Sequence, residues 1–277
     1  MQYGQFDTYN IEVDAQVPVT EKFSLGLGAS LMRIDNDAGN NNLILDGGVI
    51  ARLRPSDSSE LVAFGGLYDN CHNEQQPQIF TGGPYLPPQY QRRTFFGQDW
   101  TTGACRDSNA GVLGRAAVAD WTLRASAFRS GSIQRFYGDM LRDIQPNGIG
   151  RHSIFSQLRQ SFVSYSGEVR ASRAIAEAQR RHTIDLVLRG RDLQRDFGGT
   201  HTIDFGTARI AERVTLPEPV FTYGPLTDDH TRQITAGASY TGLWAGVGGI
   251  SDGVQKSFYR CEIAAPNVAL TQIRTAP

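Results

Sequence analysis

A cluster of aromatic and arginine residues lies between Asp69 and Arg106. Guanidinium groups bind carboxylates and phosphates through paired hydrogen bonds, and aromatic faces stack on planar groups or attract cations. This combination suits an anionic metal chelate or another large planar nutrient better than a sugar or a small ion. The candidate ligand-binding residues are Tyr85, Tyr90, Arg92, Arg93 and Trp100.

The same cluster has two structural interpretations. Aromatic residues form belts at both interfaces of a membrane barrel, so an aromatic girdle with ordinary loop packing explains them equally well. Arg92 and Arg93 could also lie at the foot of a strand and contact lipid headgroups. The sequence leaves these interpretations open.

Two cysteines, Cys71 and Cys105, lie at the two ends of this stretch. A disulfide that closes a surface loop is stable only where thiols are oxidised, outside the cytoplasm. We predict a Cys71–Cys105 disulfide, with two free thiols as the alternative. Cys261 has no candidate partner within the chain.

The sequence lacks the motifs of common catalytic and metal sites. Residues 249–253 (GISDG) match a nucleophile elbow, but no histidine follows them and the next residues have an extended pattern. The five histidines are scattered, and no helical His-Glu-x-x-His pair or phosphate-binding glycine loop occurs. Residues 35–39 lack the third ligand position and the twelfth-position Glu of a calcium loop. We therefore predict no enzyme activity, no cofactor and no metal site.

Composition restricts the function further. The net charge of the 277 residues is -1, so no general basic field exists to hold nucleic acid. Hydrophobic residues make up only 40%, which argues against a large helical core. No run of apolar residues is long enough for a membrane helix. A transmembrane β-barrel stays possible, because its lipid face uses only every second residue.

Apolar and polar residues alternate along most of the chain. Between Tyr9 and Val17 every odd position is apolar and every even position is polar. A period of two predicts strands with one apolar and one polar face. Residues 60–68 and 247–259 alternate poorly and count against this interpretation. The same period occurs in 23–31, 43–53, 121–127, 163–171, 184–188 and 234–240.

Short and long connections alternate along the chain. Tight turns are predicted near Thr20, Asp57, Asp120, Glu177 and Ala245. Five tight turns imply about ten strands, and short turns at one end with longer loops at the other are typical of outer-membrane barrels. The longer connections are predicted at residues 35–42, 69–93, 131–156 and 193–230, although a strand from residue 121 to 145 could project beyond a bilayer.

The residue types on the two faces favour a barrel over a soluble sandwich. The apolar face contains many Ala and Gly residues, which suffice against lipid, whereas a sandwich core needs large side chains. We predict an antiparallel transmembrane β-barrel whose polar face lines a lumen. The lumen residues are predicted to include Glu12, Asp14, Arg52, Arg124, Glu168 and Arg170.

Several segments resemble a known family. Residues 79–88 (IFTGGPYLPP) followed by 92–100 (RRTFFGQDW) resemble a surface loop running into a strand in the barrels of TonB-dependent outer-membrane receptors. Residues 181–192 and 228–233 are similar to barrel strands of that family. The resemblance implies a plugged barrel of 22 strands in the outer membrane of a Gram-negative bacterium. It also implies uptake of a scarce ligand, commonly an iron-siderophore complex, with outer-membrane lipid and the TonB complex as partners.

The chain departs from this family in three respects. It has no signal peptide, no recognisable N-terminal plug with a TonB-contacting segment, and no final strand ending in an aromatic residue. At about 28 residues per strand, a barrel of 22 strands needs roughly 600 residues. We therefore interpret residues 1–277 as a single incomplete barrel domain, an internal fragment, and no TonB-coupling residue can be carried over.

Two alternatives come from other classes of protein. A complete porin-like or adhesin-type barrel of about ten strands would have to pair its first and last strands. A secreted soluble β protein that acts on polysaccharide would require paired carboxylates in a cleft, and no such pair can be identified.

Overall fold

The computed structural model describes residues 2–266 and 271–274. These residues form one sheet of 14 strands, antiparallel except where β6 pairs with β8. No helix in the described ranges is long and apolar enough to cross a membrane. The strands are β1 (Gln2–Tyr3), β2 (Tyr9–Pro18), β3 (Phe23–Asp35), β4 (Asn41–Ser56), β5 (Ser59–Glu74), β6 (Gln78–Thr81), β7 (Thr102–Val118), β8 (Trp121–Ile144), β9 (Ile149–Glu177), β10 (Arg180–Gly198), β11 (Thr200–Arg209), β12 (Leu226–Trp244), β13 (Gly248–Ala264) and β14 (Thr271–Arg274), with one 3-10 turn at Gln5–Asp7.

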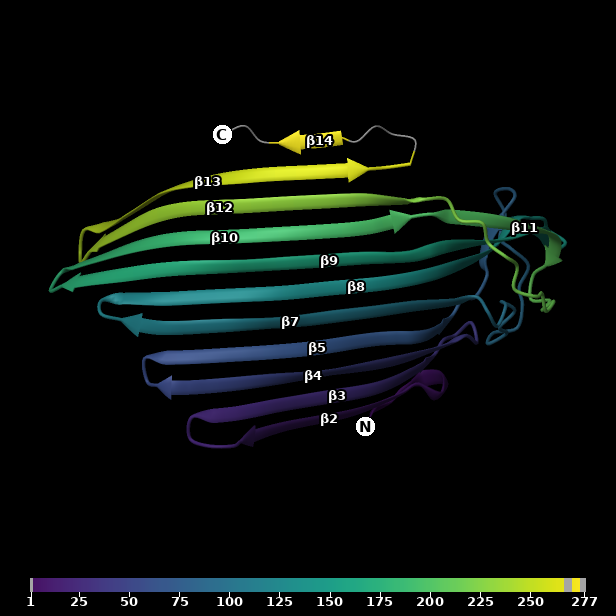
Figure 1. Cartoon of the computed structure of the whole chain (residues 1–277). Helices are drawn as coiled ribbons and strands as arrows, with labels where there is room; N and C mark the ends of the chain where they lie inside the picture. Colours follow the sequence, from purple (N-terminus) through teal and green to yellow (C-terminus); the bar gives the residue numbers. More distant parts are fainter. Residues whose placement is uncertain (1, 267–270, 275–277) are drawn as a thin grey trace.

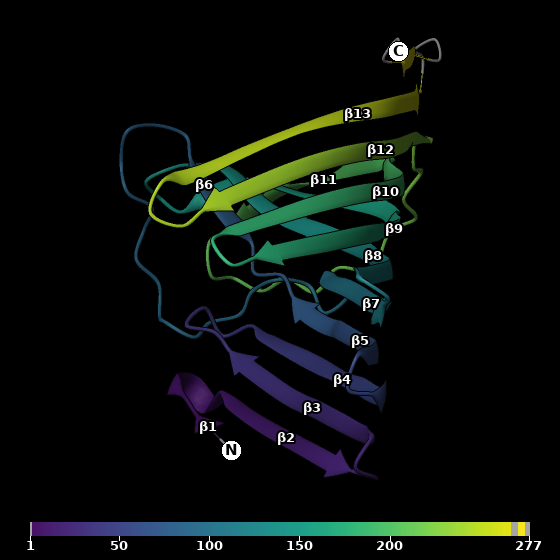
Figure 2. The same ribbon diagram turned by 90° about the vertical axis from the view of Figure 1, so that its left-hand side faces the viewer.

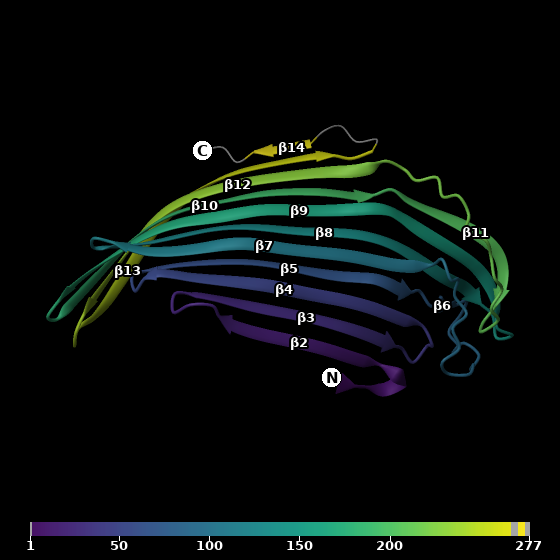
Figure 3. The ribbon, with the colours of Figure 1, turned by 60° about the horizontal axis from the view of Figure 1, so that its bottom comes forward.

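Ten long strands make up most of the sheet, and each pairs with its neighbours along the chain. The connections 19–22, 57–58, 119–120, 178–179 and 245–247 are all tight and lie at one end of the sheet (Figure 1). These are the five turns predicted from the sequence, and the prediction of about ten strands is confirmed. The opposite end carries β6, β11 and the longer loops (Figure 3).

The sheet is curved (Figures 2 and 3). The distribution of polar and apolar side chains between its two faces is the reverse of that in a soluble protein. In β12 the apolar residues Ile234, Ala236 and Ala238 are exposed. Their polar neighbours Gln233 and Thr235 are more sheltered, and Thr235 is only 1% exposed. We call these two sides the apolar face and the polar face. An exposed apolar face beside a sheltered polar face is the arrangement of a barrel that meets lipid outside and water inside.

Strand register gathers the apolar face into a band. Three successive cross-strand rows are apolar except for Lys256. The row at the turn end contains Trp121 and Tyr240, and the row at the loop end contains Arg129 and Tyr165. These bounding rows are eight residues apart, about 27 Å along the strands at about 3.4 Å per residue. A band of this height with aromatic residues at its edges fits the hydrocarbon layer of a membrane. The three rows are Leu123–Ala171–Leu186–Ala238–Val254, Ala125–Val169–Leu188–Ala236–Lys256 and Ala127–Gly167–Gly190–Ile234–Phe258.

The two outer edges of the sheet do not meet. Within the described ranges, β2 pairs with β1 and β3, and β13 pairs with β12 and β14. The sheet is therefore open, as expected from the sequence, and does not form the sealed small barrel of the porin-like alternative. The apolar face also has no second sheet packed against it in these ranges, which a soluble sandwich requires.

Some predicted loops are strands in the structure. The expectation of a long connection at residues 131–156 is wrong, because β8 continues to Ile144, β9 begins at Ile149, and only residues 145–148 form the turn. The connection 193–230 likewise contains the end of β10 and all of β11. The polar and glycine residues of this segment indicated a loop, but they are also compatible with strands. The pairing of β9 with β8 and with β11 satisfies the backbone hydrogen bonds of these residues.

Candidate functional site

The loop end of the sheet carries a small packed unit that we call the cap. It consists of the extensions of β8 and β9, the strands β6 and β11, and the loops 82–101 and 210–225 (Figures 1 and 3). Its core is apolar and closed to solvent, with Ile144 fully buried. Because the rest of the sheet is a single exposed layer, most of the buried side chains of the described residues lie here. The core residues are Phe96, Leu141, Ile144 and Ile210.

Trp100 joins the two loops of the cap. Its indole Nε1 donates a hydrogen bond to the carbonyl oxygen of Leu216 at 2.9 Å. The neighbouring side chain of Gln98, 3% exposed, donates to the carbonyl of Val214 at 2.9 Å and accepts from the amide of Leu216 at 2.8 Å. Since buried polar groups are costly unless they are paired, these bonds fix the position of the second loop on the first.

Trp100 is also the centre of an aromatic cluster. Its ring centroid lies 5.7 Å from that of Tyr137 on β8, 6.4 Å from that of Phe205 on β11 and 6.2 Å from that of Phe221. Tyr223 stacks on Phe221 at 6.0 Å. Such pairs add stability beyond the area that they bury. The cluster therefore couples both loops to the extended strands.

Polar groups surround the aromatic cluster. The hydroxyl of Tyr137 donates to Glu218 at 3.0 Å, and the guanidinium of Arg135 lies 5.4 Å from the Tyr137 ring centroid. Burial and the bond to Glu218 raise the pKa of Tyr137. The hydroxyls of Ser156 and Tyr223 are 2.7 Å apart. The cap thus combines aromatic rings with a cation and a carboxylate. This combination is suited to binding a planar or charged ligand.

The structure does not bring the five predicted ligand-binding residues together. Trp100 belongs to the aromatic cluster, whereas the hydroxyl of Tyr85 donates to the carbonyl of Ile144 at 2.8 Å. Tyr90 packs edge-on against Phe96 at 5.5 Å. Tyr85 and Tyr90 therefore anchor the loop to the core of the cap.

The two predicted arginines lie away from the aromatic cluster. Arg92 is exposed. The guanidinium of Arg93 is 3.9 Å from carboxylate oxygens of both Asp7 and Asp35 and 5.2 Å from the ring centroid of Phe6. Loop 82–101 thus crosses from the tip of β8 to the ends of β2 and β3. Ligand binding by these arginines stays a prediction.

A buried aspartate–histidine pair lies at the base of the cap. Asp139 on β8 and His152 on β9 are linked by a 2.8 Å contact between Oδ1 and Nε2. The Asp139 side chain is fully buried, and its Oδ2 has no hydrogen-bond partner among the described residues. Burial raises the pKa of Asp139, while the hydrogen bond from His152 opposes this effect. The ring of Phe205 lies 5.5 Å from that of His152 and so connects the pair to Trp100.

The described cysteine side chains do not test whether the predicted disulfide forms. The Sγ of Cys105 lies 3.4 Å from Asp107, and Cys261 is buried. The backbone pairs Cys105 with Asn70, next to Cys71. The side chain of Cys71 lies outside the described side chains, so the Cys71–Cys105 disulfide stays a prediction.

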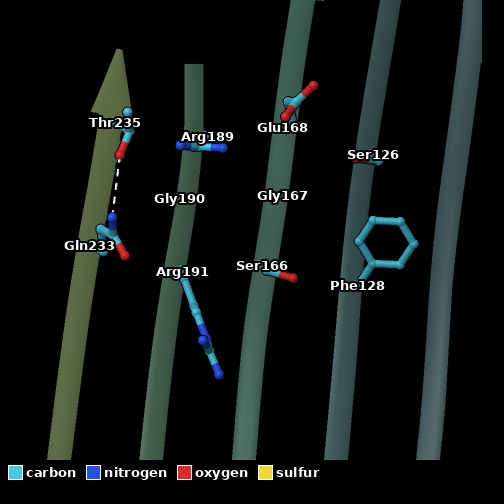
Figure 4. Close-up of a pocket in the computed structure, with 10 residues that line it drawn as sticks. All are labelled: Ser126, Phe128, Ser166, Gly167, Glu168, Arg189, Gly190, Arg191, Gln233 and Thr235. Carbon is cyan, nitrogen blue, oxygen red and sulfur yellow. Dashed lines mark hydrogen bonds between the residues drawn. The ribbon is translucent and has the colours of Figure 1, made fainter. Parts of the chain in front are cut away.

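The polar face forms the wall below the cap. A depression of about 500 Å³ crosses β8, β9, β10 and β12 (Figure 4). Arg189 of β10 lies opposite Glu168 of β9, and Arg191 lies opposite Ser166. Gln233 donates to Thr235 at 3.5 Å. Among the described residues no three histidine, cysteine or acidic side chains gather at a metal-binding distance. The wall thus presents polar and charged side chains to the hollow side.

Sequence reasoning missed most of the cap. Tyr137, Phe205, Phe221 and Tyr223 were not predicted as site residues, and neither was Glu218. One feature of the sequence could have indicated two of them. Phe221 and Tyr223 lie in a proline-containing loop, as the predicted ligand-binding residues between Tyr85 and Trp100 do. Their position beside Trp100 depends on contacts between segments more than 100 residues apart.

No family model matches the chain, and no curated protein matches it. The structure is nevertheless similar to solved receptor structures. The sheet has the fold of a TonB-dependent receptor barrel. It matches the ferric preacinetobactin receptor BauA of Acinetobacter baumannii with a TM-score of 0.72 and 10% identity, over 98% of this chain and 42% of that chain.

Two further receptors have the same barrel fold. The ferripyoverdine receptor of Pseudomonas aeruginosa, solved with ferripyoverdine bound, matches with a TM-score of 0.76 and 14% identity over 99% of this chain and 38% of that one. The ferric-catecholate import receptor Fiu of E. coli K12 matches with a TM-score of 0.74 and 12% identity over 99% and 48%. This chain therefore spans less than half the length of these receptors. The predicted barrel fold is confirmed.

Proposed function

We propose that the polypeptide carrying this chain is an outer-membrane receptor that imports a scarce nutrient, with an iron-siderophore complex as the ligand. The observation that carries the proposal is the reversed polarity of a ten-strand meander whose fold is that of receptors for ferric compounds. Residues 1–277 are one part of a single larger barrel domain, and catalysis has no role in this function.

The membrane assignment rests on the apolar band. The exposed rows through Leu188 and Ile234 would be unstable in water, because large contiguous apolar patches rarely face solvent. Lipid covers such a band without a second protein layer. The proposed partners are therefore outer-membrane lipid around the band and the TonB complex on the inner side, with the nutrient ligand on the outer side. The proposed location is the outer membrane of a Gram-negative bacterium.

Ligand capture is assigned to the cap. The short turns lie at one end of the sheet and the cap at the other, so a chain with short periplasmic turns presents its cap to the cell exterior. There the aromatic cluster and its neighbouring cation Arg135 provide flat surfaces and positive charge, and Arg92 and Arg93 add positive charge elsewhere on loop 82–101. This pair of features suits an anionic chelate.

Two measurements test the proposal. Cells that express the full-length polypeptide are fractionated and the membranes are washed with carbonate; we expect the protein to remain in the outer-membrane fraction. Uptake of iron-labelled siderophore by an iron-limited deletion strain is then compared with and without the gene. Recovery of the protein in the soluble fraction would contradict the membrane assignment, and unchanged uptake across a panel of siderophores would contradict the ligand class.

A further inference from the structure

A row of charged residues borders the apolar band at its loop end. The first apolar row below it runs from Ala127 on β8 to Phe258 on β13. Three arginines and one aspartate give the bordering row a positive charge. In the proposed orientation this row lies at the level of the lipid headgroups of the outer leaflet. Its members on β8, β9, β10, β12 and β13 are Arg129, Tyr165, Asp192, Arg232 and Arg260.

The arginines on β12 and β13 have acidic partners. Asp192 Oδ2 accepts a hydrogen bond from Nε of Arg232 at 2.8 Å, and its Oδ1 lies 2.9 Å from Nε2 of His230. Arg260 contacts Glu262 on its own strand. The single acid of the row is therefore already engaged by two neighbours.

Arg129 differs from them, because it has no acidic partner among the described side chains. Its Nη1 donates to the hydroxyl of Ser108 at 3.1 Å, and its Nε donates to the hydroxyl of Tyr165 at 3.4 Å. Its guanidinium also lies 5.9 Å from the Tyr165 ring centroid. All these contacts are with neutral groups, and both Arg129 and Tyr165 are exposed. The positive charge of Arg129 is thus uncompensated.

The guanidinium of Arg129 is turned away from the apolar band. Its Nη1 lies 3.2 Å from the position that a Cβ of Gly131 would occupy, and Gly131 is two residues closer to the loop end. Arginines at the edge of a membrane extend in this way, with the stem against apolar surface and the charge among polar groups. A phosphate group at this level can accept paired hydrogen bonds from the guanidinium, and the Tyr165 hydroxyl can donate another.

A hollow in the apolar face lies beside this arginine. Gly167 of β9 and Gly190 of β10 face each other in the first apolar row (Figure 4), next to Ala127 of β8. These neighbouring positions carry no side chain or only a methyl group, so the surface is depressed there. Methylene groups of a lipid chain can fill such a depression through dispersion contacts. Its lining on the apolar face includes Tyr165, Val169, Leu188 and Ile234.

We propose that Arg129 and Tyr165 bind the phosphate group of one membrane lipid, whose acyl chain fills the hollow at Gly167 and Gly190. The occupant is a phosphorylated lipid, because the uncompensated cation and the apolar hollow adjoin on the face that meets the membrane. The site lies outside the barrel and makes no use of the polar face. It rests on the proposed membrane location, but not on the proposed siderophore ligand.

The test measures lipid retention by the purified full-length polypeptide in detergent, by native mass spectrometry. The probes are phosphatidic acid and phosphatidylcholine with the same acyl chains. We expect one phosphatidic acid to bind saturably and more tightly than phosphatidylcholine. Arg129→Gln should weaken this binding about tenfold, since charge-assisted bonds are lost. Arg106→Gln is the matched control and should bind as the unmodified protein does, because Arg106 is exposed on the same face but donates to Asp69 at 2.8 Å.

Gly190→Leu tests the hollow separately. A Cβ at Gly190 would meet only the carbonyl oxygen of Gln233, at 3.8 Å, so the backbone accepts a side chain there while leucine fills the hollow. We expect severalfold weaker binding of phosphatidic acid. Gly114→Leu is the control, since Gly114 lies on the same face opposite Ala125 and outside the lining of the hollow.

Heat-modifiable gel mobility reports folding of each variant. If Arg129→Gln does not fold, Arg129→Lys replaces it, because lysine keeps the charge but lacks the paired donors, and severalfold weaker binding is then expected. Equal retention of the two lipids, or an equal loss in Arg106→Gln, would overturn the proposal. A loss in Arg129→Gln with unchanged binding in Gly190→Leu would indicate a site for phosphate alone and would overturn it as well.

These outcomes can be told apart from a failure of the proposed function. None of the lipid measurements uses a siderophore or cells. The carbonate wash decides the membrane location by itself, so an outer-membrane protein that retains both lipids equally would lack the site and still be a receptor.

Discussion

The indole of Trp100 donates a hydrogen bond to the backbone carbonyl of Leu216, a residue 116 positions later in the chain. This bond joins the two loops of the cap, and the aromatic rings around Trp100 join both loops to β8 and β11. Trp100 therefore links the two loops of the cap to each other and to the extended strands.

Replacement of Trp100 should loosen the second loop selectively. We expect Trp100→Phe, which keeps a ring but loses the hydrogen bond, to cost about 1 kcal/mol of local stability. Trp100→Ala should cost roughly 3 kcal/mol, since a partly buried ring is lost. Hydrogen exchange of residues 210–225 in the full-length protein measures both effects. Trp121→Phe at the turn end is the control, and equal protection of the loop in all three variants would refute the role of Trp100.

A charged side chain on the apolar face should destabilise the protein in lipid. Leu188→Arg places a guanidinium in the centre of the apolar band and is expected to destabilise the protein in lipid by roughly 2 to 4 kcal/mol. Ser239→Arg on the polar face is the matched control, because it lies opposite Asp185 and faces the hollow side. Folding into lipid vesicles, followed by heat-modifiable mobility, compares the two variants. Equal effects of both substitutions would argue against a lipid-facing band.

The Asp139–His152 pair should make the cap sensitive to pH. Burial raises the pKa of Asp139, so between about 4, the usual aspartate value, and the raised value the folded state holds a proton that the unfolded state has lost. The contribution of Asp139 to the free energy of unfolding of the cap is then fully present below pH ~4. It declines as pH rises towards the raised pKa, by about 1.4 kcal/mol for each pH unit in that window.

Asp139→Asn removes this titration, so we expect its cap to keep the same stability over that pH range. Native-state hydrogen exchange of β8 and β11, corrected for the intrinsic exchange rate at each pH, measures the slope for both proteins. Asp204→Asn is the control, because Asp204 is exposed beside Arg151 on the neighbouring strand. If the stability of the wild-type cap increases as pH rises from 4, the predicted direction of the pH dependence is wrong.

The predicted arginines can be tested apart from the aromatic cluster. We expect Arg92→Ala with Arg93→Ala to weaken siderophore binding by a few kcal/mol at most, at roughly 1.5 to 3 kcal/mol per bond to a charged group. Folding should change little, because the ion pairs of Arg93 with Asp7 and Asp35 are partly exposed and weak. Equilibrium binding in detergent measures the effect. Arg106→Ala, on the apolar face, is the control. Unchanged affinity of the double variant would show that Arg92 and Arg93 do not contact the ligand.

The strands, their faces and the five tight turns could be predicted because they are local properties. A strand such as Tyr9–Pro18 shows its two faces in the alternation of its own residues, and a turn such as 119–120 is encoded by the few residues that form it. The reversal of polarity could also be inferred, since small apolar residues on one face and charges on the other suit lipid and water respectively.

The cap could not be predicted in the same way, and its membership was decided by the tertiary structure. Of the five candidate residues, only Trp100 lies in the aromatic cluster, because the register of β8, β9 and β11 brings Tyr137 and Phe205 to it and a loop more than 100 residues away supplies Phe221. The β7–β8 and β8–β9 registers, which place Arg115 opposite Arg124 and Arg124 opposite Arg170, could not be predicted either, because nothing within one strand indicates which residue lies opposite it. Alternation determines which face a side chain occupies, but only the pairing of distant strands determines which charges and rings it meets.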